Sequence, residues 1–153
     1  MFSIIIPTFN NIDYLKICLS SLKKNSKFNN EIILHVNEGI DGTLDFVKKN
    51  KINYTYSHTN IGVCSSVNRA AEKISTDYII YGHDDMYFCP GWDVAFEEEI
   101  KRIGHNLFYL SGTMIEPAHG HIQLNCGEVH SDFNEKKLLS EYNFLDYHDF
   151  QGT

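Results

Sequence analysis

The sequence has no apolar run near the length of a membrane-spanning helix, which needs roughly 18 or more such residues. Its N-terminal residues also lack the basic segment and the small-residue cleavage site of a signal peptide. Glycine and proline are scarce, at 10 and 3 of 153 residues, which excludes collagen-like and low-complexity chains. We therefore expect a folded cytoplasmic protein without a transmembrane segment, peripheral to a membrane only through a partner.

Basic residues and closely spaced cysteines are also few. The 13 lysines and arginines face 20 aspartates and glutamates, and the net charge of −7 argues against a nucleic-acid partner, because such partners select basic surfaces. The four cysteines contain no C-x-x-C pair, so we expect reduced thiols rather than a disulfide framework. With 42% hydrophobic residues, a chain of this length can bury one core, and we expect residues 1–153 to form a single domain.

Short apolar runs alternate with amphipathic segments along the first two thirds of the chain. The runs are too short for helices and predict strands over 2–8, 31–36, 53–57, 78–81 and 107–110. Apolar residues three and four apart predict helices over 12–26, 43–49, 63–74 and 92–103. The pattern then weakens to an edge strand over 122–129 and a helix over 135–142. Strands alternating with helices predict an α/β fold, a mostly parallel sheet with helices on both faces.

Two adjacent carboxylates, Asp84 and Asp85, directly follow the fourth predicted strand. In a parallel sheet the carboxyl ends of the strands are where ligands bind. Like charges a few ångströms apart at such a position repel each other and lose hydration. A divalent cation would relieve this, and an open set of oxygen ligands suits Mg²⁺ or Mn²⁺ shared with substrate phosphates. A solvated turn that caps the next helix is the other interpretation.

Four segments follow the predicted strands in an order known from one protein family. They are Ile4-Ile5-Ile6-Pro7-Thr8-Phe9-Asn10, Asn37-Glu38-Gly39, Asn60-Ile61-Gly62-Val63 and Tyr81-Gly82-His83-Asp84-Asp85-Met86. Together they resemble the nucleotide-sugar half of family 2 glycosyltransferases, over residues 2–113. The resemblance implies a GT-A fold, which is Rossmann-like. It also implies transfer of a sugar, with inversion, from a nucleotide-diphospho-sugar to the hydroxyl of a glycan, lipid or protein acceptor, and it favours a UDP-sugar as the donor.

The resemblance further assigns individual nucleotide-sugar contacts, which are Pro7, Thr8, Phe9, Asn10, Glu38, Asn60, Gly62 and Asp84. Phe9 would pack near the nucleobase, where the other reading is an ordinary core phenylalanine. Glu38 stands where the family carries an aspartate that accepts a hydrogen bond from the base, although this turn is one residue shorter and its acid is longer. Gly62 would let the backbone approach the nucleotide.

The Asp84-Asp85 pair matches the family's D-x-D-like element. The resemblance places Asp84 near the ribose or the metal and makes Asp85 the direct ligand of Mn²⁺ or Mg²⁺. His83 replaces the usual leading aspartate, and it either ligates the metal, hydrogen-bonds the diphosphate or caps the strand. The cation would neutralise the charge that grows on the departing phosphate.

Inverting transfer also needs a carboxylate base on the opposite face of the sugar. In the family this base lies in a region that would follow Thr153, so we expect a chain truncated at its C-terminus. By elimination the candidate bases are Glu116, Asp146 and Asp149. The alternative is a non-catalytic module that binds a nucleotide-sugar or assembles with a further domain or a second copy. A sugar nucleotidyltransferase is disfavoured, because no glycine-rich basic loop follows the first predicted strand.

Overall fold

The computed structural model describes residues 1–118 and 122–147. The chain divides into two compact units, Met1–Glu99 and Ile100–Thr153. The four cysteines are free thiols, as the sequence predicts. None of the helices in the described ranges is long and apolar enough to cross a membrane.

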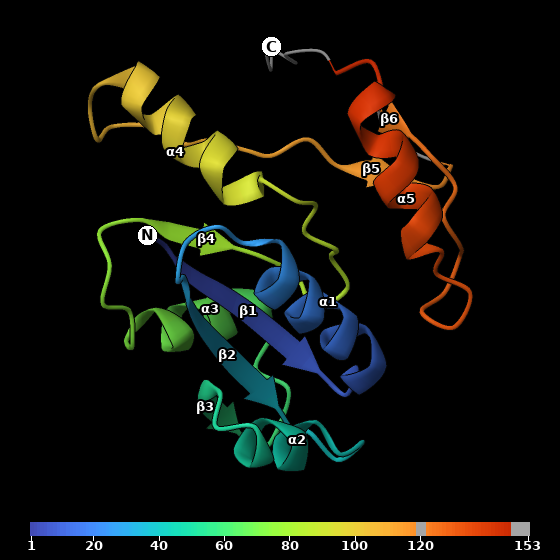
Figure 1. Cartoon of the computed structure of the whole chain (residues 1–153). Helices are drawn as coiled ribbons and strands as arrows, with labels where there is room; N and C mark the ends of the chain where they lie inside the picture. The colour runs from blue at the N-terminus through green and yellow to red at the C-terminus, as the bar shows by residue number, and fades with distance from the viewer. Residues whose placement is uncertain (119–121, 148–153) are drawn as a thin grey trace. The chain divides into compact units, whose positions relative to one another are not determined.

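The first unit is built on a four-stranded sheet in which every pair of neighbours is parallel. Its strands follow the order β3-β2-β1-β4 (Figure 1), with the bounds β1 Ser3–Phe9, β2 Glu31–Asn37, β3 Asn53–Ser57 and β4 Ile79–Tyr81. Each connection carries a helix, and these helices are α1 Ile12–Asn25, α2 Thr43–Lys49 and α3 Val63–Ala71. The predicted α/β architecture is confirmed, with small shifts at the ends of the elements.

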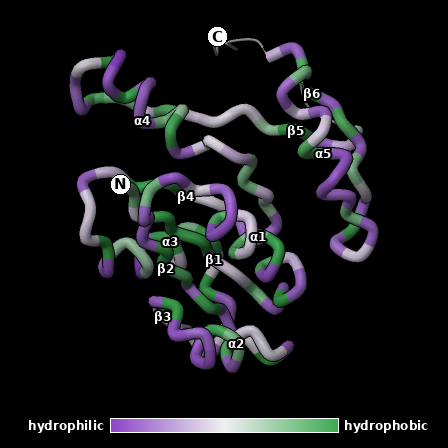
Figure 2. The backbone as a smooth tube through the Cα atoms, viewed as in Figure 1, coloured by the Kyte–Doolittle hydropathy of each residue, from purple (hydrophilic) through white to green (hydrophobic). Residues whose placement is uncertain are grey.

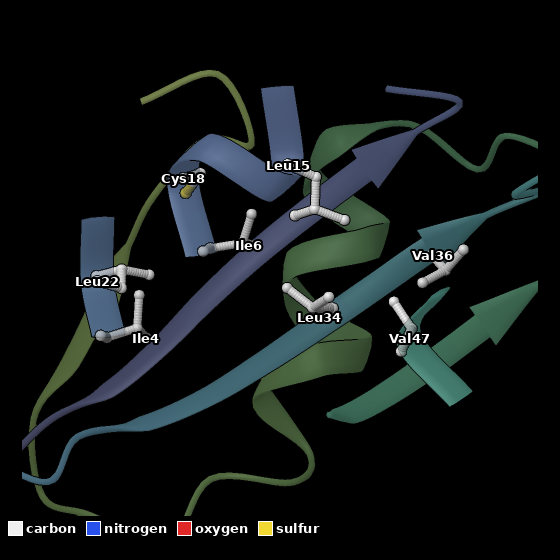
Figure 3. Close-up of a cluster of buried hydrophobic side chains, with 8 residues drawn as sticks. All are labelled: Ile4, Ile6, Leu15, Cys18, Leu22, Leu34, Val36 and Val47. Atoms are coloured by element: carbon white, nitrogen blue, oxygen red, sulfur yellow. The ribbon is translucent and has the colours of Figure 1, made fainter. Parts of the chain in front are cut away.

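Side chains of β1 and β2 alternate between two faces, and each face packs against its own helices. The face toward α1 and α2 holds the larger buried cluster (Figure 3), made of Ile4, Ile6, Leu15, Cys18, Leu22, Leu34, Val36 and Val47. On the opposite face Ile5 and Ile33 pack against Ala70 of α3. Figure 2 shows hydrophobic residues along the middle of the sheet and hydrophilic stretches on the surrounding loops. Helices therefore cover both faces of the sheet. The carboxyl edge, where the strands lead into the loops, is left as the place for a site.

The first turn of α4 (Trp92–Ile103) is anchored by a buried carboxylate. Asp93 is fully buried and accepts hydrogen bonds from the backbone N–H groups of Lys27 and Phe28 and from Asn30 Nδ2, at 2.8–3.0 Å. Hydrogen bonds to an ionised acceptor are strong, and they compensate for the hydration that the carboxylate loses. Asp93 thereby holds the start of α4 against the loop that connects α1 to β2.

The second unit contains a two-stranded parallel pair and one helix. Its elements are β5 Ile115–Glu116, β6 Ile122–Gln123, α5 Glu135–Glu141 and the 3₁₀ helix Tyr142–Phe144. The helix predicted over 135–142 is confirmed. The strand predicted over 107–110 is wrong, and the edge strand predicted over 122–129 is limited to two residues. Leu107 and Tyr109 are 90% and 93% exposed, and within the described residues no neighbouring strand pairs with that run.

Candidate functional site

Asn10 and Glu38, which follow the ends of β1 and β2, both adopt left-handed backbone, with φ of 48° and 58°. This conformation costs roughly 1–2 kcal/mol for a residue with a side chain, and such strain tends to gather at functional sites. Asn10 Nδ2 donates a hydrogen bond to Glu38 Oε2 at 3.2 Å, while Asn10 Oδ1 accepts one from the Ile40 N–H at 3.0 Å. The amide of Asn10 thus holds the Glu38 carboxylate at the carboxyl edge of the sheet.

Gly39 makes this arrangement sterically feasible. Its φ is +71°, and a Cβ atom added there would lie 2.9 Å from both Leu44 Cβ and Val36 Cγ1. Real Cβ atoms do not approach other carbons so closely, so only glycine permits the tight turn from β2 toward α2.

Asp84 lies on the other side of β1 from Glu38, after the end of β4. Asn11 Nδ2 donates a hydrogen bond to Asp84 Oδ1 at 3.1 Å. Burial raises the pKa of Asp84 above its ordinary value and the charge of Asp85 adds to this, whereas the Thr8 and Asn11 side chains oppose the rise. The Thr8 hydroxyl is buried close to this carboxyl, yet it reaches hydrogen-bond geometry with no group among the described residues. The Thr8 hydroxyl and the Asp84 carboxyl can therefore each form further hydrogen bonds where the neighbouring strands β1 and β4 end.

Negative charge shapes the surroundings of this acid pair. Burial, followed by the charges of Asp84 and Asp85, raises the pKa of the Cys18 thiol to about 12. Burial, Cys64 and the same two acids raise the pKa of Tyr81. The field at this end of β4 therefore favours a cation over an anion.

The side chains that could bind a metal at the end of β4 provide the type of ligand atom that a hard divalent cation prefers. Asp84 and Asp85 offer carboxylate oxygens, the ligands that Mg²⁺ and Mn²⁺ prefer. His83 is exposed, with its ring centroid 4.8 Å from that of Tyr81. In the described part of the chain no three His, Cys, Asp or Glu side chains form a group able to hold a metal. Such a cation would therefore need additional ligands, as it does when substrate phosphates complete its coordination.

The turn between β3 and α3 also lies at the carboxyl edge of the sheet. Asn60 Oδ1 accepts a hydrogen bond from the Gly62 N–H at 2.9 Å. Gly62 has φ of +78°, and a Cβ atom there would meet nothing within 4 Å. Glycine is required here for its backbone conformation, and the open space beside it leaves room for a ligand to approach the backbone.

Phe9 is the last residue of β1 and is 46% exposed, so it is not an ordinary core phenylalanine. Pro7 is half-buried within the same strand. Among the candidate bases, Glu116 is half-buried in β5 and Asp146 is exposed, and both belong to the second unit. Asp149 lies outside the described residues. The role of these acids as bases stays a prediction.

Two residues of this edge were not singled out from the sequence. Asn11 binds Asp84, and the buried side chain of Asn37 joins the ends of β1 and β3 through Thr8 and Ser57. The one sequence feature that could have indicated them is an amide side chain at, or just after, the end of a predicted buried strand. Amides are common in turns for local reasons, so this signal alone does not separate a site residue from a turn residue.

Comparison with models of known protein families classifies the chain. The model of the family described as Glycosyl transferase family 2 matches residues 3–150. The chain belongs to glycosyltransferase family 2. By its description, this family consists of glycosyl transferases. No curated protein matches the chain significantly.

Solved structures similar to this family 2 chain include three of S. aureus TarS. The first, of TarS 1–349, shares 24% identity with a TM-score of 0.60, over 66% of this chain and 32% of that one. The second, of TarS 1–349 in complex with UDP, shares 24% identity with a TM-score of 0.65, over 80% of this chain and 38% of that one. The third, of TarS, shares 19% identity with a TM-score of 0.53, over 67% of this chain and 20% of that one.

The likeness to TarS shows the fold, a GT-A-like mostly parallel sheet with helices, and confirms the predicted class. This chain spans between a fifth and two fifths of the length of those TarS chains. The family match and the fold thus agree with the resemblance carried by the four strand-end segments. They do not test the individual site residues or the metal, which stay predictions.

Proposed function

We propose that this glycosyltransferase family 2 chain binds a nucleotide-diphospho-sugar at the carboxyl edge of its sheet and takes part in transferring the sugar to a hydroxyl acceptor. The observation that carries the proposal is a pair of hydrogen bonds at the end of β1. The consecutive residues Asn10 and Asn11 bind Glu38 on one side and Asp84 on the other. In a nucleotide-sugar the base and the diphosphate extend in opposite directions from the ribose, and these two acids flank the same strand end.

Glu38 is suited to the base end of the donor. Asn10 donates a hydrogen bond to its Oε2 atom, and Oε1 would accept a hydrogen bond from a base N–H. The half-exposed ring of Phe9, one residue before Asn10, offers a flat apolar surface for the base. One of the similar proteins, S. aureus TarS 1–349, was crystallised in complex with UDP, which supports a UDP-sugar as the favoured donor.

Asp85, with Asp84 and His83, would hold Mn²⁺ or Mg²⁺ at the diphosphate end. When bound, the cation supplies a Lewis acid that stabilises the charge developing on the departing phosphate. Asp84 is partly buried and oriented by Asn11, so it acts from a fixed position, whereas Asp85 is exposed and free to reach a ligand. The buried Thr8 hydroxyl supplies one further polar group toward the ribose and the phosphates.

The transfer step requires the acceptor hydroxyl to lose its proton as the sugar–phosphate bond breaks. With an inverting geometry, a carboxylate on the face of the sugar opposite the diphosphate takes that proton. Glu116 and Asp146 are the candidates within the described residues, and the acceptor is a glycan, lipid or protein.

A thermal-shift titration tests the donor site. The chain is mixed with UDP-, GDP- and dTDP-sugars, with and without Mn²⁺, alongside the variants Asp85→Asn and Asp77→Asn. Ligand at about 100 times its dissociation constant adds roughly 2.7 kcal/mol to the free energy of unfolding, a rise of several degrees in Tm. We expect a Mn²⁺-dependent rise with UDP-sugars that disappears in Asp85→Asn and persists in Asp77→Asn, where the exposed acid precedes β4 instead of following it.

No rise with any nucleotide-sugar would contradict the proposed donor site. A rise that does not need Mn²⁺ would keep the donor site and contradict the metal. Donor binding without transfer to any acceptor would favour the non-catalytic alternative.

A further inference from the structure

The side chain of Asn37, the last residue of β2, is 3% exposed and uses its amide fully. Its Nδ2 donates to the Thr8 carbonyl oxygen at 3.3 Å and to Ser66 Oγ at 3.0 Å. Its Oδ1 accepts from the Ile61 N–H at 3.0 Å and from Ser57 Oγ at 3.1 Å. An asparagine amide has two donor hydrogens and two acceptor lone pairs. Both ends of this amide are therefore saturated by protein groups.

These four partners come from separate segments of the carboxyl edge. Thr8 is near the end of β1, Ser57 ends β3, Ile61 belongs to the turn before α3, and Ser66 lies in the first half of α3. No other described side chain at this edge bonds to all of these segments. Through backbone and side chain together, Asn37 joins three strand ends and one helix.

Ser66 tightens the connection to the turn. Its hydroxyl is fully buried and donates to the Gly62 carbonyl oxygen at 2.6 Å. Asn37 therefore reaches the turn twice, directly through the Ile61 N–H and indirectly through Ser66. Gly62 itself has a positive φ, one of several conformations open to glycine, and these hydrogen bonds select it from among them.

His35 braces the same network from within the sheet. It is fully buried, its Nδ1 lies 2.7 Å from Thr55 Oγ1, and its Nε2 lies 3.1 Å from Ser57 Oγ. With a proton on Nε2, the ring donates to Ser57, and the single hydroxyl hydrogen of Ser57 is then shared between Asn37 Oδ1 at 3.1 Å and the Thr59 carbonyl oxygen at 2.8 Å. His35 thus supports the amide of Asn37 indirectly, through the Ser57 hydroxyl.

We infer that Asn37 is a positioning residue of the donor site, an inference that rests on the proposed function. It touches no ligand in this arrangement, since its amide is buried and saturated. It precedes Glu38 in the chain, and it fixes the Ile61-Gly62 turn and the end of β1 relative to that acid. The network therefore sets the distance between the base-binding side of the edge and the backbone of the turn, which is the width available to a nucleotide.

The inference is tested by measuring the dissociation constants of UDP, GDP and dTDP, each with Mn²⁺, by calorimetry on the full chain. The variants are Asn37→Ala, Ser66→Ala and, as a matched control, Asn30→Ala. Asn30 also bridges two segments, accepting from the Phe2 N–H and donating to Asp93, but it precedes β2 at the opposite edge of the sheet. Thermal unfolding of each variant is recorded in parallel, which separates lost stability from lost affinity.

We expect Asn37→Ala to weaken binding of the preferred nucleotide about tenfold or more, and Ser66→Ala to weaken it less. Asn30→Ala should lower Tm while leaving affinity within about twofold. In the double variant Asn37→Ala/Ser66→Ala the loss should be smaller than the product of the single losses, because the two side chains act through one network.

Wild-type protein that binds none of the three nucleotides would overturn the proposed function and this inference with it. Wild-type binding with unchanged affinity in Asn37→Ala would overturn the inference alone. If Asn37→Ala does not fold, Ser66→Ala decides: an affinity equal to wild type would contradict the positioning role. An equal loss of affinity in Asn30→Ala would show a general effect of instability and would also overturn it.

Discussion

At the scale of single residues, the candidate site is defined by acids whose surroundings differ. Asp84 is partly buried and has a raised pKa, while its neighbour Asp85 is exposed. A carboxylate that is buried without a compensating cation destabilises the ligand-free fold. Functional sites commonly carry such a cost, because the same group later meets its ligand.

Replacing Asp84 by asparagine keeps the shape of the side chain and removes its charge. Since the folded pKa is raised, the folded state holds its proton more tightly than the unfolded state, and Asp84 lowers stability as the pH rises through that pKa. At pH 7.5, without nucleotide or metal, Asp84→Asn should therefore have a Tm a few degrees above wild type. Differential scanning calorimetry measures this, and the gain should shrink below pH 4.

The same Asp84→Asn variant should lose the Mn²⁺-dependent stabilisation by a nucleotide-sugar. Asp77→Asn, an exposed acid before β4, serves as the control and should change neither quantity. A ligand-free Tm below that of wild type would contradict the view that burial makes Asp84 costly.

At the scale of elements, the loops after the strands decide where the site residues lie. The turn from β2 to α2 and the turn from β3 to α3 both contain a glycine with positive φ. Their environments differ, because a Cβ atom at Gly39 would collide with Leu44 and Val36 while one at Gly62 would meet nothing. A side chain at Gly39 would meet both a steric clash and an unfavourable backbone conformation, whereas one at Gly62 would meet only the unfavourable backbone conformation.

Gly39→Ala should lower the free energy of unfolding by about 2–4 kcal/mol, because overpacking and left-handed strain add. Gly62→Ala should cost about 1–3 kcal/mol, because its backbone (φ 78°, ψ 164°) lies in a region that is essentially restricted to glycine. Urea denaturation of both variants measures the difference. A cost below about 1 kcal/mol at Gly39 would contradict the close packing of the β2–α2 turn.

A buried histidine makes β2 sensitive to acid. Burial, assisted by the positive charge of Arg69, lowers the pKa of His35 below its ordinary value. Between that lowered value and about 6.5, the unfolded chain binds more protons than the folded one, so stability falls as the pH drops below about 6.5. The stability that neutral His35 provides is fully present above that pH.

His35→Gln should therefore flatten the dependence of unfolding free energy on pH between about 5 and 7, relative to wild type. Guanidinium unfolding at a series of pH values gives the slopes directly. An unchanged slope in His35→Gln would mean that the buried ring does not contribute to acid sensitivity.

At the scale of the whole molecule, the chain divides into two compact units with an extended stretch after α4. Leu107 and Tyr109 in that stretch are almost fully exposed. Proteases cleave exposed segments that lack regular structure before they cleave packed elements.

Brief digestion with chymotrypsin should therefore cut first near Leu107 and Tyr109. Mass spectrometry should find an N-terminal fragment that ends in this stretch and contains the entire four-stranded sheet. First cuts at Phe2 or Leu34, both buried in the core, would contradict the exposure of the stretch after α4.

Local patterns determined much of the fold. The isoleucines of β1 and the helical spacing of Leu15, Cys18 and Leu22 predict their elements, because short-range periodicity reports which face is buried. The acid pair after β4 was also evident, since Asp84 and Asp85 are adjacent in the chain. The strand predicted over 107–110 failed for the complementary reason, because a strand needs a neighbouring strand that periodicity does not specify.

Only the tertiary structure decided which strand-end residues meet. Asn10 and Glu38 are 28 residues apart, Asn11 and Asp84 are 73 apart, and their contacts depend on the strand order β3-β2-β1-β4. The saturated amide of Asn37 likewise depends on partners from four other segments. The sequence by itself therefore determined the elements and the types of site residue, while their arrangement required the long-range pairing of the sheet.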